Sequence, residues 1–506
     1  MSMMESFFDI NRNSKEVFEG LDIVKHDDFC SEWMNQYPVL FISFKDVESL
    51  DFETAYSKLR ATIADVCKKL VYLVSNDLVN PADKVIFERL QYKQSDIEEI
   101  QNSLKTIMRM MHDMYGRPVI LLIDEYDVPL TKASEQKMIR PDYYPKMLDV
   151  IRGILSAALK SNEYLKFGVV TGCLKIAKES IFTGVNLFKA YSVLDRRFST
   201  YFGFTESEIS ELFAKAELTE RMELVRSWYD GYVFGNTKVF CPWDVVNYVA
   251  DSVDDPETDP ENYWRNTSGN EIIRTFVERT DFSVKGKFEI LMNGGTITQK
   301  ISDDLTYDTL HESEDHLWSV LLMTGYLTKA DPETKGNIVE LKIPNLEIAG
   351  IFQDTVAQYF TDHLNDADQK SMMTALWSGD EVAASNIISD LLWKTISYMD
   401  YHEDYYHAFL TGIFVGRGYE VESNKERGLG RPDIKLTDDE NRRILIIEAK
   451  RSESEKQMEH DCREALKQIV DGEYAKGLEA FDQVLCYGIA FYQKKALVKI
   501  SLQPQK

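Results

Sequence analysis

The sequence from Gly430 to Lys450 is G-R-P-D-I-K-L-T-D-D-E-N-R-R-I-L-I-I-E-A-K. Residues 432–436 alternate between apolar and polar side chains, as a half-buried strand does. Residues 443–447 form a short apolar run rich in β-branched side chains, and the polar residues 437–441 lie between the two runs. This stretch therefore predicts a β-hairpin.

Two acids and a lysine lie at the ends of the predicted strands. Antiparallel pairing brings Asp433, near the start of the first strand, and Glu448, at the end of the second, to one side of the sheet. Two carboxylates beside Lys450 form an oxygen site that suits Mg²⁺ or Mn²⁺. Such a metal polarises a phosphodiester and lowers the pKa of a bound water, and Lys450 can orient that water or stabilise the transition state. The pattern P-D-x(14)-E-x-K also occurs by chance, and taken alone it favours a surface hairpin with solvated charges.

The flanking segments strengthen the functional interpretation. The pattern predicts a helix, a strand, the hairpin, a second helix and two more strands, over residues 403–416, 419–423, 432–447, 457–470, 484–492 and 496–502. The first six of these elements, in the order αβββαβ, resemble the core of the PD-(D/E)XK nuclease superfamily. The resemblance extends to E-R-G-L-G-R-P-D (Glu426 to Asp433) and to A-L-K-Q-I-x-x-x-x-Y (Ala465 to Tyr474).

The resemblance implies a role for each of five residues. Asp433 and Glu448 would hold the metal, and Lys450 would be the catalytic lysine. Glu426 would be an additional acid, and Gln468 would face the site from the second helix. A plain amide on the helix surface is an equally open interpretation of Gln468.

The first part of the chain has a different pattern, in which apolar strands alternate with helices. Strands are predicted over residues 38–44, 118–123 and 166–171, and helices over residues 51–74, 83–90, 96–114 and 144–159. A short helix is expected to end near residue 8. Strands that alternate with helices predict an α/β layer with a parallel sheet.

Polar residues follow two of these strands. Asp124 and Glu125 end the apolar run V-I-L-L-I, and Thr171 ends the next strand, so all three lie where a parallel sheet binds its ligands. An apolar strand that ends in Asp-Glu is the Walker B arrangement, in which the Asp holds Mg²⁺ on a nucleotide and the Glu positions the attacking water. Thr171 would be the polar sensor. Two strand-end acids that cap a loop are an equally open interpretation.

A longer series of motifs extends through the chain. In order they are V-I-L-L-I-D-E-Y-D-V-P-L, V-V-T-G-C-L-K-I-A-K-E-S-I-F-T-G, R-R-F-S-T-Y-F-G-F-T, W-Y-D-G-Y-x-F-G, C-P-W-D-V-x-N-Y and Y-W-x-N-T-S-G-N. Together they resemble bacterial AAA-ATPase-like proteins that carry a C-terminal PD-(D/E)XK nuclease domain. The resemblance implies an AAA-like core over residues 1–204, a helical or winged-helix region over 205–330, a connecting region over 331–385 and a nuclease-like domain over 386–506.

The same resemblance concerns a pair of arginines and a phosphate-binding loop. Arg196 or Arg197 could read a γ-phosphate, although a structural ion pair is the plainer interpretation of both. Members of the family carry a Walker A loop before the helix that matches Met1–Phe8, and no G-x-x-x-x-G-K-[ST] occurs in these 506 residues. ATP, a ligand of the family, is therefore not expected to be held productively by this chain as given.

Composition limits the classes of partner. A chain of 506 residues with 44% hydrophobic and 28% charged residues predicts a globular protein of two or three domains. The net charge of −26 argues against unspecific attachment to nucleic acid or anionic membrane, but residues 390–506 are nearly balanced in charge. Six scattered cysteines without a C-x-x-C pair predict reduced thiols in the cytoplasm, and no apolar run suggests a membrane span. A homo-oligomer stays open.

These observations favour a metal-dependent nuclease, which hydrolyses phosphodiester bonds, fused to an AAA-ATPase-like module without its phosphate loop. The expected partner is nucleic acid, with DNA as the first candidate and RNA left open. A non-catalytic scaffold that binds nucleic acid or protein is the alternative, and the intact set of Asp433, Glu448 and Lys450 argues against it. An NTP-dependent switch is a third interpretation, which the absent phosphate loop weakens.

We predict that this chain, as given, does not turn over ATP. Asp124 and Glu125 can place magnesium and water, but the β- and γ-phosphates of the nucleotide are held by the N–H groups and lysine of the phosphate loop. Without them the advantage of orientation, up to roughly 7–11 kcal/mol, is not realised. A phosphate-release assay should show no turnover above the blank. Mg²⁺-dependent turnover that is lost in Glu125→Gln would contradict this prediction.

Overall fold

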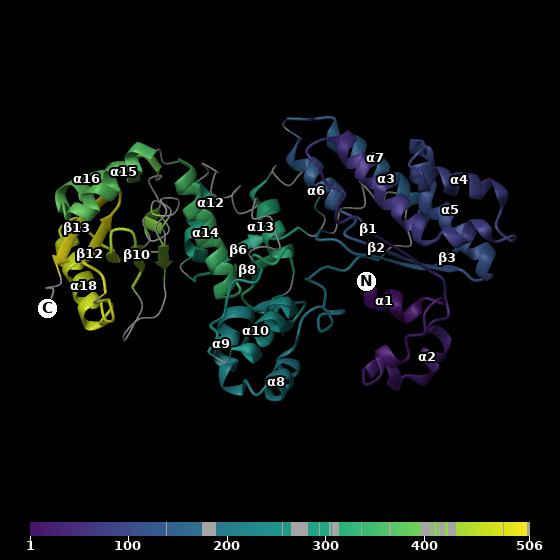
Figure 1. The fold of residues 1–506 in the computed structure, drawn as a ribbon, viewed down its shortest axis with the longest axis horizontal. Helices are drawn as coiled ribbons and strands as arrows, with labels where there is room; N and C mark the ends of the chain where they lie inside the picture. Colours follow the sequence, from purple (N-terminus) through teal and green to yellow (C-terminus); the bar gives the residue numbers. More distant parts are fainter. Residues whose placement is uncertain are drawn as a thin grey trace. The chain divides into compact units, whose positions relative to one another are not determined.

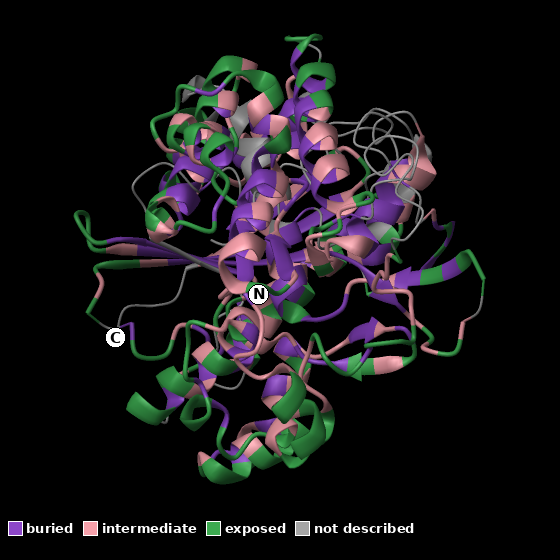
Figure 2. Cartoon of the chain, turned by 90° about the vertical axis from the view of Figure 1, so that its right-hand side faces the viewer, coloured by how far each residue is buried: buried purple, intermediate pink, exposed green. Residues whose placement is uncertain are grey.

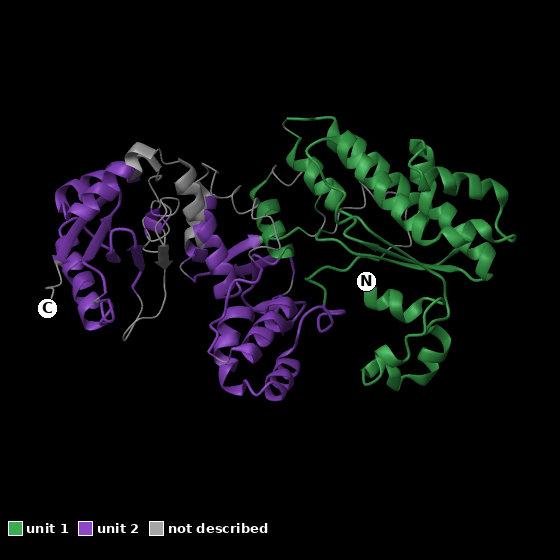
Figure 3. Ribbon diagram, viewed as in Figure 1, with its two compact units in different colours: residues 1–195, 300–324 green, residues 196–299, 325–506 purple. Residues whose placement is uncertain are grey.

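The structure is a computed structural model of the chain. It describes residues 1–137, 139–174, 189–255, 257–264, 282–292, 294–302, 305, 313–334, 336–363, 366–395, 406, 409–411, 414, 420–423, 432–478 and 480–502. The chain divides into two compact units (Figure 3). Unit 1 comprises residues 1–195 and 300–324, and unit 2 comprises residues 196–299 and 325–506.

Unit 1 is built on a parallel three-stranded sheet. Its strands are β1 (Val39–Ser43), β2 (Val119–Asp124) and β3 (Leu165–Val170), in the order β1-β2-β3. All pairings are parallel, with Ser43 opposite Asp124 and Ile123 opposite Val170. Burial on both faces explains the continuous apolar run of β2. The predicted α/β layer is therefore confirmed, and the carboxyl ends of the three strands meet at one edge.

Helices cover both faces of this sheet. The helices of unit 1 are α1 (Ser2–Phe8), α2 (Asp27–Trp33), α3 (Phe52–Lys69), α4 (Pro81–Gln91), α5 (Ile97–Tyr115), α6 (Val128–Glu135), α7 (Tyr143–Leu159) and α13 (Glu314–Met323). Figure 1 shows α3, α4, α5 and α7 on one side of the sheet and α1 and α2 on the other. Phe7 and Phe8 of α1 pack against Ile120 and Leu122 of β2. Alternate residues of the central strand therefore contribute to two separate cores.

The helix boundaries follow from their caps. α5 begins at Asp96, whose side chain accepts a hydrogen bond from the backbone N–H of Glu99 at 2.8 Å, and it ends at Gly116 in the left-handed conformation. The helix predicted over residues 51–74 is shorter, because Leu70 leaves the helical conformation and a 3₁₀ turn, Val71–Ser75, follows. Figure 2 shows the buried residues along the strands and on the inner faces of the helices.

Residues 196–299 and 325–363 contribute a mixed region to unit 2. Its elements are α8 (Glu206–Lys215), α9 (Met222–Tyr229), β4 (Tyr232–Phe234), β5 (Thr237–Val239), α10 (Pro242–Asp254), α12 (Phe282–Met292), β6 (Ile297–Lys300), β7 (Thr328–Lys329), β8 (Ile338–Lys342) and α14 (Leu346–His363). β4 pairs with β5, and the other strands form a sheet in the order β6-β8-β7. Tyr229, Phe240 and Tyr248 are fully buried in the core among α8, α9 and α10.

The remainder of unit 2 is a five-stranded mixed sheet with helices. Its elements are α15 (Asp366–Ser378), α16 (Glu381–Thr395), β9 (Glu420–Ser423), β10 (Ile434–Asp438), β11 (Arg443–Arg451), α18 (Met458–Asp471), β12 (Gln483–Tyr492) and β13 (Lys495–Leu502). The strand order is β13-β12-β11-β10-β9, in which only the central pair β11 and β12 is parallel. The helix predicted over residues 403–416 falls mostly outside the described residues.

The predicted hairpin is confirmed with two changes in the bounds of its strands. β10 extends to Asp438, so Thr437 and Asp438 belong to the strand rather than to the turn. The reason is local, because the Asp438 carboxylate accepts hydrogen bonds from the backbone and side chain of Asn441 and pairs with Arg443 at 2.7 Å. β11 is also longer than predicted and extends to Arg451, so Glu448 lies inside the strand.

α16 closes the open edge of this sheet with its side chains. The backbone N–H groups of Ala496, Val498 and Ile500 in β13 donate to Ser389, Ser385 and Glu381 at 2.9, 2.9 and 2.8 Å. Side chains four residues apart on a helix are about 6 Å apart along its axis, which matches the spacing of every second strand residue. The helix therefore satisfies donors that an exposed edge would offer to another chain.

The edge contact predicts a stability effect for Ser385→Ala. The change leaves the N–H of Val498 without its acceptor, which should lower the free energy of unfolding by about 1–3 kcal/mol. Chemical denaturation followed by circular dichroism measures this loss. Thr374→Ala is the matched control, because the Thr374 hydroxyl donates to Lys370 within its own helix. Equal effects of the two substitutions would contradict the edge contact.

Two carboxyl groups are fully buried in the mixed region of unit 2. Asp244 lies in the first turn of α10 and Glu347 in the first turn of α14. Glu347 accepts a hydrogen bond from the backbone N–H of Trp264 at 2.9 Å. Burial, with the charge of Asp244 beside it, raises the pKa of Glu347 to about 9, and burial also raises the pKa of Asp244. The folded chain therefore holds a proton here that the unfolded chain releases.

This proton predicts that stability falls with rising pH. Because the pKa of Glu347 is higher in the folded state, stability is greatest below its ordinary value of 4.5 and is lost as the pH rises toward about 9. Glu347→Gln, which is neutral throughout, should flatten this part of the curve of melting temperature against pH. Glu340→Gln, at an exposed glutamate of the same unit, should leave the slope unchanged. Parallel curves for wild type and Glu347→Gln would refute the assignment.

Candidate functional site

The hairpin of β10 and β11 places the two predicted acids side by side. The register pairs Ile434 with Ile447, so the next pair outward is Asp433 with Glu448. The backbone N–H of Asp433 donates to Oε2 of Glu448 at 3.3 Å, and the backbone N–H of Ala449 donates to Oδ2 of Asp433 at 2.8 Å. Each carboxylate is therefore bound to the backbone beside the other, and the two groups converge.

Burial and a lysine define the electrostatics of this pair. Glu448 is 1% exposed, so its carboxylate is held within the protein. The Nζ of Lys450 lies 3.8 Å from Oε1 of Glu448, and its side chain is partly exposed. A buried carboxylate requires hydrogen bonds or a counter-charge to offset the loss of its hydration. The backbone N–H groups and Lys450 supply both.

The donor set of the pair fits a hard divalent cation. Asp433 and Glu448 offer carboxylate oxygens, and Mg²⁺ is commonly held through one or two carboxylates while it keeps several waters. No cluster of three or more His, Cys, Asp or Glu side chains suited to a metal occurs among the residues that the structure describes. Glu426, the predicted additional acid, lies outside them.

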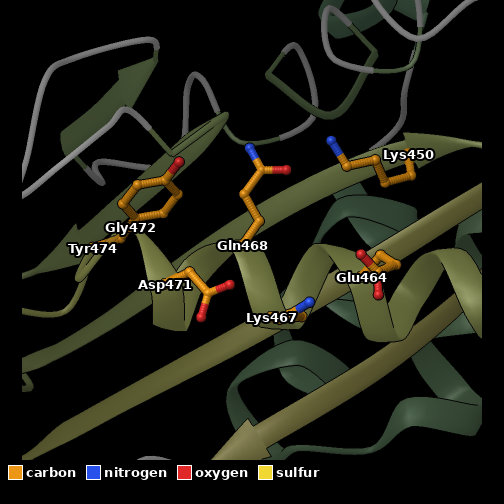
Figure 4. A pocket seen from close by; sticks show the side chains of 7 residues that line it. All are labelled: Lys450, Glu464, Lys467, Gln468, Asp471, Gly472 and Tyr474. Atoms are coloured by element: carbon orange, nitrogen blue, oxygen red, sulfur yellow. The ribbon is translucent and has the colours of Figure 1, made fainter.

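A cavity of about 400 Å³ opens beside Lys450 (Figure 4). It is lined by Lys450, Glu464, Lys467, Gln468, Asp471, Gly472 and Tyr474. Figure 4 shows the amide of Gln468, from α18, and the ammonium of Lys450, from β11, extending into the same space. The structure therefore brings Gln468 to the same cavity as Lys450.

The sheet and α18 approach each other closely beside Glu448. Gly488 of β12 is the register partner of Glu448, and a Cβ at Gly488 would collide with the carbonyl oxygen of Cys462 in α18. Ile469 of α18 packs in the same core as Ile446 of β11. The absence of a side chain at Gly488 therefore lets α18 lie against the face of the sheet that carries Glu448 and Lys450.

A second group of predicted residues meets at the strand ends of unit 1. The hydroxyl of Thr171 donates to Oδ1 of Asp124. Glu125, the next residue, has a left-handed backbone conformation with φ of 53°. Burial and the neighbouring Asp124 raise the pKa of the Glu125 carboxyl. Asp124, Glu125 and Thr171 thus form one local site.

Hydrogen bonds hold the loops after β2 and β3 together around this group. The backbone N–H of Tyr126 donates to the carbonyl of Thr171 at 3.1 Å, and its hydroxyl donates to the carbonyl of Leu174 at 2.7 Å. The N–H of Leu174 donates to Oδ2 of Asp127 at 2.9 Å. These bonds fix the position of Thr171 relative to the acids of β2.

Comparisons with known proteins match one family model to each of two parts of the chain. Residues 1–182 match the family model described as predicted AAA-ATPase, and residues 401–500 match the model of the PD-(D/E)XK nuclease superfamily. The chain joins an AAA-ATPase-like domain to a PD-(D/E)XK nuclease superfamily domain. An uncharacterised protein in the vnfD 5′ region of Azotobacter chroococcum mcd 1 is 21% identical over 442 residues. That match covers 85% of this chain and 77% of the other protein, so it extends beyond either domain model.

The predicted arginines lie outside the AAA-ATPase-like match, in unit 2. Arg196 pairs with Glu333 at 3.3 Å, and both side chains are largely exposed. The guanidinium of Arg197 lies over the ring of Phe198 at 5.1 Å. Asp124, Glu125 and Thr171 belong to unit 1. Arg196 thus takes part in an exposed ion pair, and Arg197 in a contact with an aromatic ring.

In the nuclease superfamily domain, sequence reasoning missed most of the wall of the cavity. Glu464, Lys467 and Asp471 line it together with Gln468. Positions i, i+3, i+4 and i+7 of a helix share one face, so this wall could have been found from Gln468 by helical spacing alone.

None of the helices in the described part of the chain has the length and apolar character that a membrane span needs.

Proposed function

We propose that the PD-(D/E)XK domain is a metal-dependent nuclease that hydrolyses phosphodiester bonds in nucleic acid, with DNA as the first candidate. The observation that carries the proposal is the convergence of Asp433 and Glu448 beside Lys450. This combination, two acids fixed by the backbone and a lysine at a cavity, suits phosphodiester hydrolysis better than a passive binding surface.

Asp433 and Glu448 would hold Mg²⁺ or Mn²⁺. When bound there, the ion would polarise the phosphodiester and make a bound water acidic enough to attack it. Glu448 is held by its burial, and Asp433 is held by the hydrogen bond from the backbone of Ala449. The two carboxylates are therefore already in position before a metal ion binds. Preorganised groups of this kind need no rearrangement at the moment of reaction.

Lys450 and Gln468 would act on the substrate. Lys450 lies partly exposed at the cavity, where its ammonium can stabilise negative charge that develops on the phosphate. The Gln468 amide, which lines the same cavity, can donate to a phosphate oxygen. Glu426 is proposed as a further acid of the same site on the strength of the sequence resemblance alone.

For the rest of the chain we propose the arrangement that the motifs imply. Residues 1–204 would form the AAA-like core, residues 205–330 a helical or winged-helix region, residues 331–385 a connection and residues 386–506 the nuclease-like domain. The bond between Thr171 and Asp124 favours a second role, a nucleotide-responsive switch in a protein that also carries a phosphate loop. In this chain as given the AAA-like module would act as a scaffold.

The nuclease proposal predicts metal-dependent cleavage by the purified chain. Labelled single- and double-stranded DNA and RNA should be compared with Mg²⁺, Mn²⁺ and EDTA. Glu448→Ala should abolish cleavage, because it removes one of the two proposed metal ligands. Cleavage that persists in EDTA or in Glu448→Ala would overturn the proposal.

The same assay separates the role of Lys450 from that of a phosphate anchor. Lys450→Ala should lower the rate by roughly 10²–10³ or more, the usual effect of losing one transition-state donor, while binding of DNA changes little. Lys476→Ala is the matched control, since Lys476 also pairs with a glutamate, Glu473, but lies outside the cavity lining. Equal losses of binding and cleavage in Lys450→Ala would mark it as an anchor.

A further inference from the structure

A second lysine, Lys435, lies on the same face of the sheet as the acid pair. Lys435 is in β10 and is only 4% exposed. Its register partner in β11 is Ile446, which packs against Ile469 of α18. Directly opposite residues of a sheet point to the same side, so Lys435 faces the side that α18 covers.

The register puts Lys435 next to both acids. Asp433 is two residues away along the chain, and alternate residues of a strand point to one side, about 6.6–6.8 Å apart. Glu448 is two residues beyond Ile446 in β11 and is therefore the diagonal neighbour of Lys435. Diagonal neighbours in an antiparallel pair are about 7–8 Å apart, which is within reach of a long side chain.

The two lysines of this face, Lys435 and Lys450, differ in how far their side chains are exposed to solvent. Lys450 is partly exposed and lines the cavity, so it can meet a substrate. Lys435 is closed off from solvent and does not line the cavity. A buried ammonium is costly unless opposite charge is close by, and the register gives Lys435 three acidic neighbours: Asp433, Glu448 and, directly opposite in β9, Glu422.

We propose that Lys435 is an internal counter-ion of the acid pair, a positioning residue that balances Asp433 and Glu448 and sets how tightly the site holds a divalent cation. The inference rests on the proposed metal site and deepens it. Lys435 and Lys450 bring two positive charges to the two negative charges of Asp433 and Glu448, and the register also places Glu422 of β9 opposite Lys435. The carboxylates can then stay converged within a buried part of the sheet, at the expense of cation affinity.

The charge balance has a consequence for cation binding. The fixed ammonium of Lys435 repels an incoming divalent ion, so its removal should strengthen binding. A lysine with a purely structural role would act differently, because its loss would lower stability and leave the affinity for the cation unchanged or weaker. The direction of the change in affinity therefore separates the two roles.

The test is isothermal titration calorimetry, in which the dissociation constant of Mn²⁺ is measured for the full chain at low ionic strength. Binding at this site is defined as the Mn²⁺ binding that is lost in Glu448→Ala. Subtracting the titration of Glu448→Ala removes the contribution of other acids on the chain. Lys435→Met, which keeps the length of the side chain and removes its charge, should lower the dissociation constant of that site roughly tenfold or more. Lys435→Gln, which also keeps a polar end, should change it in the same direction.

Lys329→Met is the matched control. Lys329 is also 4% exposed and donates to the carbonyl of Gly235, in a part of unit 2 that does not contribute to the acid pair. It should lower stability without any change in Mn²⁺ affinity. Circular dichroism spectra of all variants verify that the fold is kept.

The outcomes distinguish this inference from the function on which it rests. If the wild type shows no Glu448-dependent Mn²⁺ binding, the proposed metal site fails, and the inference fails with it. If the wild type binds Mn²⁺ and both Lys435 variants bind it equally or more weakly, the metal site stands and the counter-ion role is wrong. Tighter binding in both Lys435 variants, and not in Lys329→Met, supports the role.

Discussion

The candidate site depends on the hydrogen bonds that hold the carboxylates of Asp433 and Glu448 to backbone N–H groups across the hairpin. Ala449 binds the carboxylate of Asp433, and Asp433 binds that of Glu448, so neither acid can move unless the ladder between β10 and β11 opens. β11 is the central strand of the five, and its register therefore has neighbours on both sides. A shift of the β11 register by one residue would turn Glu448 to the opposite face of the sheet. Stability of the sheet and geometry of the site are thus the same constraint.

That constraint extends beyond the residues matched to the nuclease superfamily. The match covers residues 401–500, whereas the edge of β13 is closed by side chains of α16, Glu381–Thr395. Ser385 accepts a hydrogen bond from Val498 of β13 while its hydroxyl donates to the carbonyl of Glu381 in its own helix. The helix therefore belongs with the sheet, and a fragment that omits it would leave the edge of β13 open.

Local patterns predicted most strands and much of the site, and packing decided the rest. The apolar run that ends in Asp124 and the alternation before Thr437 reflect which side chains are buried, and a window of a few residues is enough to detect both patterns. The end of β10 was misplaced because Asp438 binds Asn441 and Arg443, and polar residues that close a turn resemble the turn itself. The position of Lys435 relative to Glu448 follows from pairing across the sheet, which no window of sequence contains.

Charge explains how an acidic chain could work on a polyanion. The net charge of −26 opposes nucleic acid, but exposed charges are screened beyond about 8–10 Å at ordinary salt. The cavity itself is close to neutral, since Lys450 and Lys467 are offset by Glu464 and Asp471. Its own side chains therefore attract a phosphate only weakly. The cation that Asp433 and Glu448 are proposed to hold would add positive charge to that of the described side chains of the cavity and so strengthen the attraction for a phosphate.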